Sequence, residues 1–135
     1  MRLRPDLSAG VVSGEPALKK VLYFLNSGTR GGVEEHVLCL LRWLDRETFD
    51  PVLVCPAELL KFIEPELKAY HVRYYPLCIR RWTHLKDIRA YWRVLKQEKP
   101  DIVHSHLFYA TLYAAPLSKL AGVPAVVETA HIREA

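Results

Sequence analysis

The stretch Lys20-Val-Leu-Tyr-Phe-Leu-Asn-Ser-Gly-Thr-Arg-Gly-Gly-Val-Glu-Glu-His-Val-Leu38 decides the fold of this chain. Residues 21–25 form a short, continuous apolar run, which is typical of a strand buried on both faces of a parallel sheet. After the glycines, apolar residues recur at spacings of three and four, which predicts a helix with one face against the sheet. Those residues are Val33, Val37, Leu40, Leu41 and Leu44. The stretch is therefore a strand, a glycine-rich turn and a helix.

The alternation of strand and helix repeats along the rest of the chain. The joints carry residues that end helices or strands, such as Pro56, Pro100 and Gly122. Pro65 falls inside the second predicted helix, which we expect it to kink or divide. The further expected strands are residues 49–55, 72–76, 101–105 and 124–129, and the further expected helices are residues 57–70, 83–98 and 109–121. This order predicts a Rossmann-like α/β fold, a three-layer α/β/α sandwich with a mainly parallel sheet.

The length of 135 residues suits one domain with a hydrophobic core. Residues 1–18 mix proline, serine, glycine and isolated charges without periodicity, which predicts a flexible leader before a domain at residues 19–135. No apolar run approaches the roughly 20 residues that span a bilayer, and we expect a cytoplasmic location. The three cysteines lie far apart without a C-x-x-C pair, so we expect reduced thiols.

In open parallel sheets, ligands bind at the carboxyl ends of the strands, where the strand order reverses. The predicted joints at that edge are residues 28–35, 104–109 and 128–133. Gly31 and Gly32 lie in the first joint, where backbone N–H groups and a helix dipole favour a phosphate. Glycine turns are also frequent in such joints for steric reasons alone, so the turn by itself leaves ligand contact open.

The same turn disfavours a dinucleotide-binding site. Gly28, Gly31 and Gly32 give G-x-x-G-G rather than G-x-G-x-x-G, and no P-loop lysine follows. Cys55 and Pro56 stand where a ribose-binding carboxylate is expected. A nicotinamide dehydrogenase is therefore only a third hypothesis.

Histidines supply other polar side chains at this edge. His104 and His106 would point to one face of a strand, but a third metal ligand is not evident, so we expect no metal site. We expect His104 to pack within the sheet and His106 to reach the cleft. His131 follows the fifth strand, where a neutral imidazole could bind a hydroxyl or phosphate, or simply lie on the surface.

Residues 20–38 resemble the opening of retaining, nucleotide-sugar-dependent glycosyltransferases with the GT-B fold, whose first loop reads G-G-x-E before a helix. A second block is similar to the fourth and fifth strands of that family, glycosyltransferase family 4. It comprises Lys99-Pro-Asp-Ile-Val-His-Ser-His106, a small-residue helix, Ala121-Gly-Val-Pro-Ala-Val-Val127 and a histidine at position 131. The resemblance covers residues 19–131. It implies the amino-terminal half of an enzyme that transfers a sugar, with retention, from a nucleotide-diphosphate sugar to an unidentified acceptor.

In this family the amino-terminal domain mainly holds the acceptor, and a second domain supplies most contacts to the nucleotide. We therefore expect a domain fragment that is inactive alone and needs no cofactor besides its donor substrate. The resemblance assigns Gly31 and Gly32 to the donor diphosphate, Glu34 to organising the loop and helix start, and His131 to the acceptor or the active centre. We also expect Arg30 and His106 on the acceptor side of the cleft.

Positive charge is concentrated in residues 80–99, which contain seven basic and two acidic residues. The whole chain has a net charge of +4. The predicted helix at 83–98 has an apolar stripe flanked by basic residues, a pattern of helices that lie on anionic membranes. The stripe is Leu85, Ile88, Trp92 and Leu95, and the basic residues are Arg89, Arg93 and Lys96. Alternatively, the stripe packs on the sheet and the charges are solvated.

The basic segment leaves a second class of function open, a non-catalytic module that binds polyanions or a membrane. Acceptors of the resembled family are often lipid-linked, which suits a peripheral position at the inner face of the membrane. Nucleic acid is not an expected partner, because no recognition motif or exposed aromatic ladder accompanies the charge.

Overall fold

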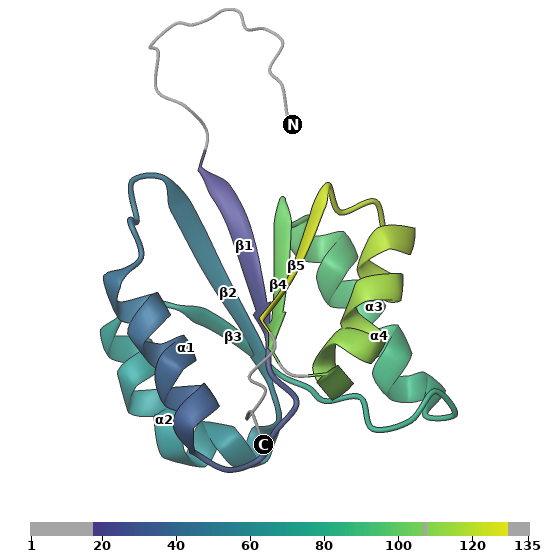
Figure 1. Ribbon diagram of the computed structural model, residues 1–135, viewed down its shortest axis with the longest axis horizontal. Coiled ribbons are helices and arrows are strands. Elements are labelled where there is room, and N and C mark those ends of the chain that lie inside the picture. Colours follow the sequence, from purple (N-terminus) through teal and green to yellow (C-terminus); the bar gives the residue numbers. More distant parts are fainter. Residues whose placement is uncertain (1–17, 107, 130–135) are drawn as a thin grey trace, which may run out of the picture.

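Five parallel strands form a central sheet between two pairs of helices (Figure 1). The computed structural model describes residues 18–106 and 108–129. The strands are β1 (Lys19–Phe24), β2 (Phe49–Cys55), β3 (Arg73–Pro76), β4 (Ile102–His106) and β5 (Ala125–Thr129). The helices are α1 (Gly32–Trp43), α2 (Ala57–Ala69), α3 (Leu85–Glu98) and α4 (Phe108–Leu120). The strand order is β3-β2-β1-β4-β5, so the predicted Rossmann-like three-layer sandwich is confirmed.

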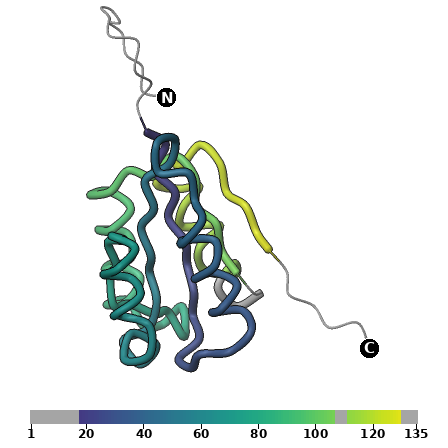
Figure 2. The backbone as a smooth tube through the Cα atoms, turned by 90° about the vertical axis from the view of Figure 1, so that its left-hand side faces the viewer, coloured from purple at the N-terminus to yellow at the C-terminus, as the bar shows by residue number. Residues whose placement is uncertain are grey.

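The helices cover the sheet in pairs, with α1 and α2 on one face and α3 and α4 on the other (Figure 1). Alternate side chains of β1 pack against the helices on opposite faces of the sheet. Val21 and Tyr23 pack towards α1 and α2, whereas Leu22 and Phe24 pack towards α3 and α4. Burial on both faces explains why β1 reads as a continuous apolar run. Figure 2 views the molecule from the side of α1 and α2, with β5 in yellow at one edge of the sheet.

Helix α2 continues through Pro65, so of the two expected effects of this proline, division of the helix is wrong and a kink stays a prediction. Leu60, Ile63 and Leu67 are buried in the core on both sides of the proline, while Pro65 itself is exposed. Each such buried side chain contributes about 1.5–3 kcal/mol. Together they outweigh the cost of an interior proline, about 3 kcal/mol.

Helix α3 is rotated relative to the predicted stripe. Its buried residues are Tyr91, Val94, Leu95 and Glu98. By contrast Leu85 is 61% exposed and Trp92 is half-buried. The predicted apolar stripe does not include Glu98, because this side chain is charged. The Glu98 carboxylate is instead buried against partners on β1 and β3. This burial turns the helix and brings Leu85 and Trp92 outward.

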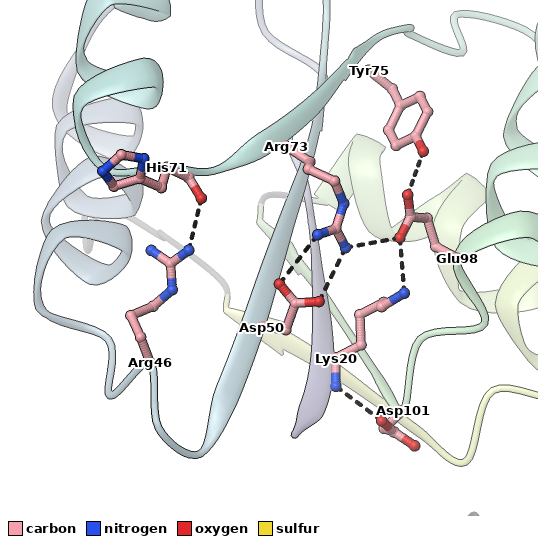
Figure 3. A network of polar contacts seen from close by, with 8 residues as sticks. All are labelled: Lys20, Arg46, Asp50, His71, Arg73, Tyr75, Glu98 and Asp101. Carbon is pink, nitrogen blue, oxygen red and sulfur yellow. Dashed lines mark hydrogen bonds and ion pairs between the residues drawn. The ribbon is translucent and has the colours of Figure 1, made fainter. Parts of the chain in front are cut away.

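Glu98 is the centre of a polar network at the amino ends of the strands (Figure 3). Its carboxylate lies 3.0 Å from Lys20 Nζ and 3.0 Å from Arg73 Nη2, and it accepts a hydrogen bond from the Tyr75 hydroxyl. Arg73 also lies 3.1 Å from Asp50. The network thus joins the end of α3 to β1, β2 and β3.

Burial alone would raise the pKa of Glu98, but hydrogen bonds from Tyr75, Lys20 and Arg73 together lower it to about 2. The side chain is only 7% exposed. The carboxylate is therefore charged at neutral pH and holds this edge of the sheet together. The opposite edge, where the strands end, is left to bind ligands.

Candidate functional site at the carboxyl edge of the sheet

The neighbouring strands β1 and β4 define the point where the strand order reverses. The chain leaves β1 for α1 on one face of the sheet and leaves β4 for α4 on the other. Connections that diverge in this way open a crevice at the carboxyl ends of the two strands, the usual ligand site of doubly wound sheets. The turn before α1 lies at the carboxyl end of β1 (Figure 1).

Glu34 holds the glycine turn from the first turn of α1. Its Oε1 atom accepts a hydrogen bond of 2.8 Å from the Gly31 backbone N–H, and its carboxylate also accepts one from the Ser27 hydroxyl. The Glu34 residue is 5% exposed. Gly31 precedes the helix and accepts its first backbone hydrogen bond, from Glu35 N–H at 2.9 Å. The carboxylate thus joins both ends of the turn, as the acidic partner of a capping box does.

The two glycines differ in what surrounds them. A Cβ atom at Gly31 would lie 3.3 Å from Glu34 Oε1, tighter than most such contacts. A Cβ atom at Gly32 would meet no described atom within 4 Å. Gly31 has an extended backbone with φ −141°, which any residue adopts. The fold itself therefore does not require glycine at position 32, and the bare backbone there faces open space at the start of α1.

Arg30 is turned towards helix α2. Its guanidinium lies 2.9 and 2.5 Å from the two carboxylate oxygens of Glu66, donates to the Phe62 carbonyl at 2.9 Å, and also pairs with Glu35. Hydrogen bonds to Glu66 and then to Glu35 raise the pKa of Arg30 above its usual value. Arg30 therefore ties the glycine turn to α2, and its predicted place on the acceptor side of the cleft stays a prediction.

His106 is fully buried, so the expectation that its side chain is exposed in the cleft is wrong. Its ring stacks on His104 with centroids 4.3 Å apart, and it lies 6.1 Å from His36 and 6.2 Å from Tyr23. The half-buried His104 lies within hydrogen-bonding distance of Thr129, with Nε2 and Oγ1 2.6 Å apart. The rings of His36 from α1 and Tyr23 from β1 therefore cover His106. The position of His106 along its strand did not reveal this cover.

The ring contacts of His106 do not test the other roles predicted for the histidines. Within residues 18–106 and 108–129, no group of three or more histidine, cysteine or acidic side chains could hold a metal ion. His131 lies outside the described residues, as does nearly all of the predicted leader at residues 1–18.

The segment from β3 to α3 also reaches this edge, which the sequence did not indicate. The Asn26 side chain donates to the Ile79 carbonyl at 2.7 Å and accepts from the Ile79 N–H at 3.1 Å. The Tyr113 hydroxyl donates to the Arg80 carbonyl at 2.9 Å, and its ring meets Trp82 edge-on with centroids 5.0 Å apart. In Figure 1 this segment runs along the carboxyl edge, below the strands. Only long-range contacts produce this arrangement, so no local motif could have revealed it.

A family model described as Glycosyltransferase Family 4 matches residues 30–135. The chain belongs to glycosyltransferase family 4. This family 4 domain is 32% identical over 105 residues to the UDP-Gal:alpha-D-GlcNAc-diphosphoundecaprenol alpha-1,3-galactosyltransferase of Escherichia coli. The alignment covers 74% of this chain and 26% of that enzyme, so the chain spans about a quarter of its relative.

Solved structures share the fold of the family 4 domain. MurG from Acinetobacter baumannii superposes with a TM-score of 0.60 and 20% identity, over 82% of this chain and 35% of that one. A glycosyltransferase from Rickettsia africae gives a TM-score of 0.65 at 14% identity, over 87% and 31%. A putative UDP-N-acetylglucosamine 2-epimerase from Listeria monocytogenes gives 0.56 at 16%, over 84% and 31%. Since one of these is described as an epimerase, the fold alone does not assign a reaction.

The outer face of α3 in this family 4 domain combines apolar and basic side chains. Leu85 is 61% exposed, and Lys96 Nζ lies 5.4 Å from the centre of the half-buried Trp92 ring. Arg89 and Arg93 are exposed. Among the helices of the described residues, none has the length and apolar character needed to cross a membrane.

Proposed function

We propose that this chain is the amino-terminal, acceptor-side domain of a retaining glycosyltransferase that uses a nucleotide-diphosphate sugar. The observation that carries the proposal is the glycine turn, held by Glu34 at the strand-order reversal of a family 4 domain. The name of the Escherichia coli relative supports UDP-activated galactose as a donor class and a diphospholipid-linked sugar as an acceptor class.

In this proposal the donor diphosphate lies against the backbone of Gly31 and Gly32. The first N–H groups of a helix have no partner within the helix, and the helix dipole favours negative charge there. Glu34 is buried and accepts hydrogen bonds from the Ser27 hydroxyl and the Gly31 N–H, which fixes the turn, so the N–H groups that follow Gly31 at the start of α1 are in place before the donor arrives. Preorganised donors stabilise the departing diphosphate, because they need not reorient as its charge develops.

The remaining assigned residues act around this turn. Arg30 acts on the acceptor side by fixing the turn against α2, as its contacts with Glu66 suggest. His106 supports the acceptor side of the cleft through its stack with His104. His131 belongs to the active centre, after β5. A second domain downstream supplies the nucleotide contacts, so the domain at residues 19–135 is inactive alone.

The test is a transfer assay on this domain joined to its native downstream sequence. A panel of nucleotide sugars is offered with a short-chain diphospholipid-linked N-acetylglucosamine, and the product is analysed by NMR. We expect transfer from a UDP-sugar with retention at the anomeric carbon, and none from the 135-residue chain. Hydrolysis or epimerisation without transfer, or transfer with inversion, would contradict the proposal.

A second candidate function is a module that binds an anionic membrane, as a peripheral protein of the cytoplasmic face. The exposed Leu85 beside basic side chains on α3 favours it, since apolar and cationic groups on one helix face suit a lipid interface. Co-sedimentation with anionic and neutral vesicles tests this function. We expect binding to anionic vesicles only, and loss of binding when Arg89 and Arg93 are both changed to Glu. Equal failure with both vesicle types at low salt would end this candidate.

A further inference from the structure

A hollow of about 240 Å³ lies at the carboxyl edge, where the segment from β3 to α3 meets the connection after β1 and helix α4. It is lined by Asn26, Ile79, Arg80 and Tyr113. The paired hydrogen bonds between Asn26 and Ile79 and the bond from Tyr113 to the Arg80 carbonyl fix its walls. Tyr113 is 7% exposed, so that wall is anchored in the core. The hollow is thus a built feature of the fold.

The rim of the hollow is cationic and aromatic. Residues 77–86 contain Arg80, Arg81 and Lys86 and no acidic residue. The Arg80 side chain is 56% exposed, and its nearest carboxylate, that of Glu58, is 3.7 Å away and itself 60% exposed. Trp82 is 45% exposed although its ring is braced edge-on against Tyr113. The Trp82 indole and the Arg80 guanidinium, whose ion pair with Glu58 is exposed to solvent, are therefore both accessible to a ligand.

The chemistry of this rim matches a sugar joined to a phosphate. A guanidinium binds phosphate oxygens through two parallel N–H donors. An exposed indole offers an apolar face on which the C–H face of a sugar ring packs. Asn26 lies two residues before Gly28, so the hollow and the glycine turn begin from the same connection after β1. The two features therefore lie at the same edge of the sheet.

We propose that this hollow binds the junction between sugar and diphosphate in the acceptor, with Arg80 on a phosphate oxygen and Trp82 against the sugar ring. The proposal rests on the proposed function, because it takes the glycine turn as the donor site and adds the hollow as a further place of contact for the acceptor, besides Arg30 and His106. Arg80 and Trp82 are then specificity-determining residues, since an acceptor lacking either the phosphate or the sugar loses one of the two contacts.

NMR titration of the chain tests this proposal. The probe is a short-chain alkyl diphosphate that carries α-linked N-acetylglucosamine, and the comparators are the same alkyl diphosphate without sugar, inorganic pyrophosphate and free N-acetylglucosamine. We expect saturable binding of the probe, a shift of the Trp82 indole N–H signal, and binding of each comparator weaker by about tenfold or more, as for loss of one charged hydrogen bond.

Variants separate the two contacts. Arg80→Gln and Trp82→Ala should each weaken probe binding by about tenfold, Trp82→Phe should retain most of it, and the matched control Lys61→Gln, at an exposed position of α2, should stay within about twofold of the native chain. Thermal melting confirms that each variant is folded, and if Trp82→Ala is unfolded, the affinity of Arg80→Gln and the shift of the Trp82 signal in the native chain decide the matter.

Three results would overturn the inference: no saturable binding, pyrophosphate that binds as tightly as the probe, or an unchanged affinity in Arg80→Gln and Trp82→Ala alike with no shift of the Trp82 signal. Failure here with sugar transfer intact in the longer chain refutes only the acceptor site. Absence of transfer refutes the proposed function, whatever the hollow binds.

Discussion

Replacement of Glu98 by Gln removes one charge and leaves the shape of the side chain nearly unchanged. The native carboxylate is 7% exposed and lies 3.0 Å from both Lys20 and Arg73. The pKa of Glu98 falls from an ordinary 4.5 to about 2 on folding. A shift of that size corresponds to about 3 kcal/mol of stability at neutral pH. Because Arg73 is half exposed and partly screened, we expect a loss of about 2–3 kcal/mol.

The pH dependence gives this prediction its sign. A carboxylate whose folded pKa is lowered stabilises the fold above its unfolded pKa, and that contribution is lost as the pH falls towards the folded pKa. The stability gap between the native chain and Glu98→Gln should therefore be full above about pH 5.5 and shrink steadily between about pH 4.5 and pH 2.

Urea unfolding followed by circular dichroism measures both quantities, at pH 7 and at steps down to pH 3. Glu47→Gln is the matched control, since Glu47 is exposed on the turn before β2 and should change stability by less than about 0.5 kcal/mol. A Glu98→Gln variant as stable as this control at pH 7, or a gap that does not shrink on acidification, would refute the reasoning.

Three further predictions concern stability, each measured as a shift in the urea midpoint. Glu34→Gln should cost about 1–2 kcal/mol because the buried acceptor of the Gly31 N–H loses its charge, and a change below about 0.5 kcal/mol would contradict the role of Glu34 in the turn. Gly122→Ala should cost about 1 kcal/mol, since Gly122 has φ +88°; a neutral change would count against this. Pro65→Ala should gain about 1–2 kcal/mol by restoring a helix hydrogen bond, and any loss would contradict the account of α2.

The layers of the fold were readable from the sequence because they depend on local patterns. A strand buried on both faces must be apolar throughout, as residues 21–25 are, and the ends of elements need residues such as Gly122. The glycine turn was also predictable from local pattern. A strand precedes Gly31 and a helix follows it, so the turn must lie at the carboxyl end of that strand.

Features that depend on contacts between distant segments could not be read in this way. The rotation of α3 follows from Glu98, which bonds with residues 23 and more positions away along the chain. Burial of His106 depends on His36 from α1 and Tyr23 from β1. The bond between Asn26 and Ile79 spans 53 residues. Residue type suggested that these side chains could serve a site, but only the tertiary contacts show which of them are exposed.

The most direct test of the donor site is the Michaelis constant for the nucleotide sugar after Gly32→Ala in the longer chain. A Cβ atom at position 32 meets no described atom within 4 Å, so the fold should keep its stability, while a diphosphate against that backbone would meet the new methyl group. Gly28→Ala, whose Cβ would lie an ordinary 3.5 Å from Glu58 Cβ, is the matched control. We predict that Gly32→Ala raises the donor Michaelis constant by about tenfold or more at unchanged melting temperature. Donor kinetics equal to those of the control would contradict the proposal that this turn holds the donor diphosphate.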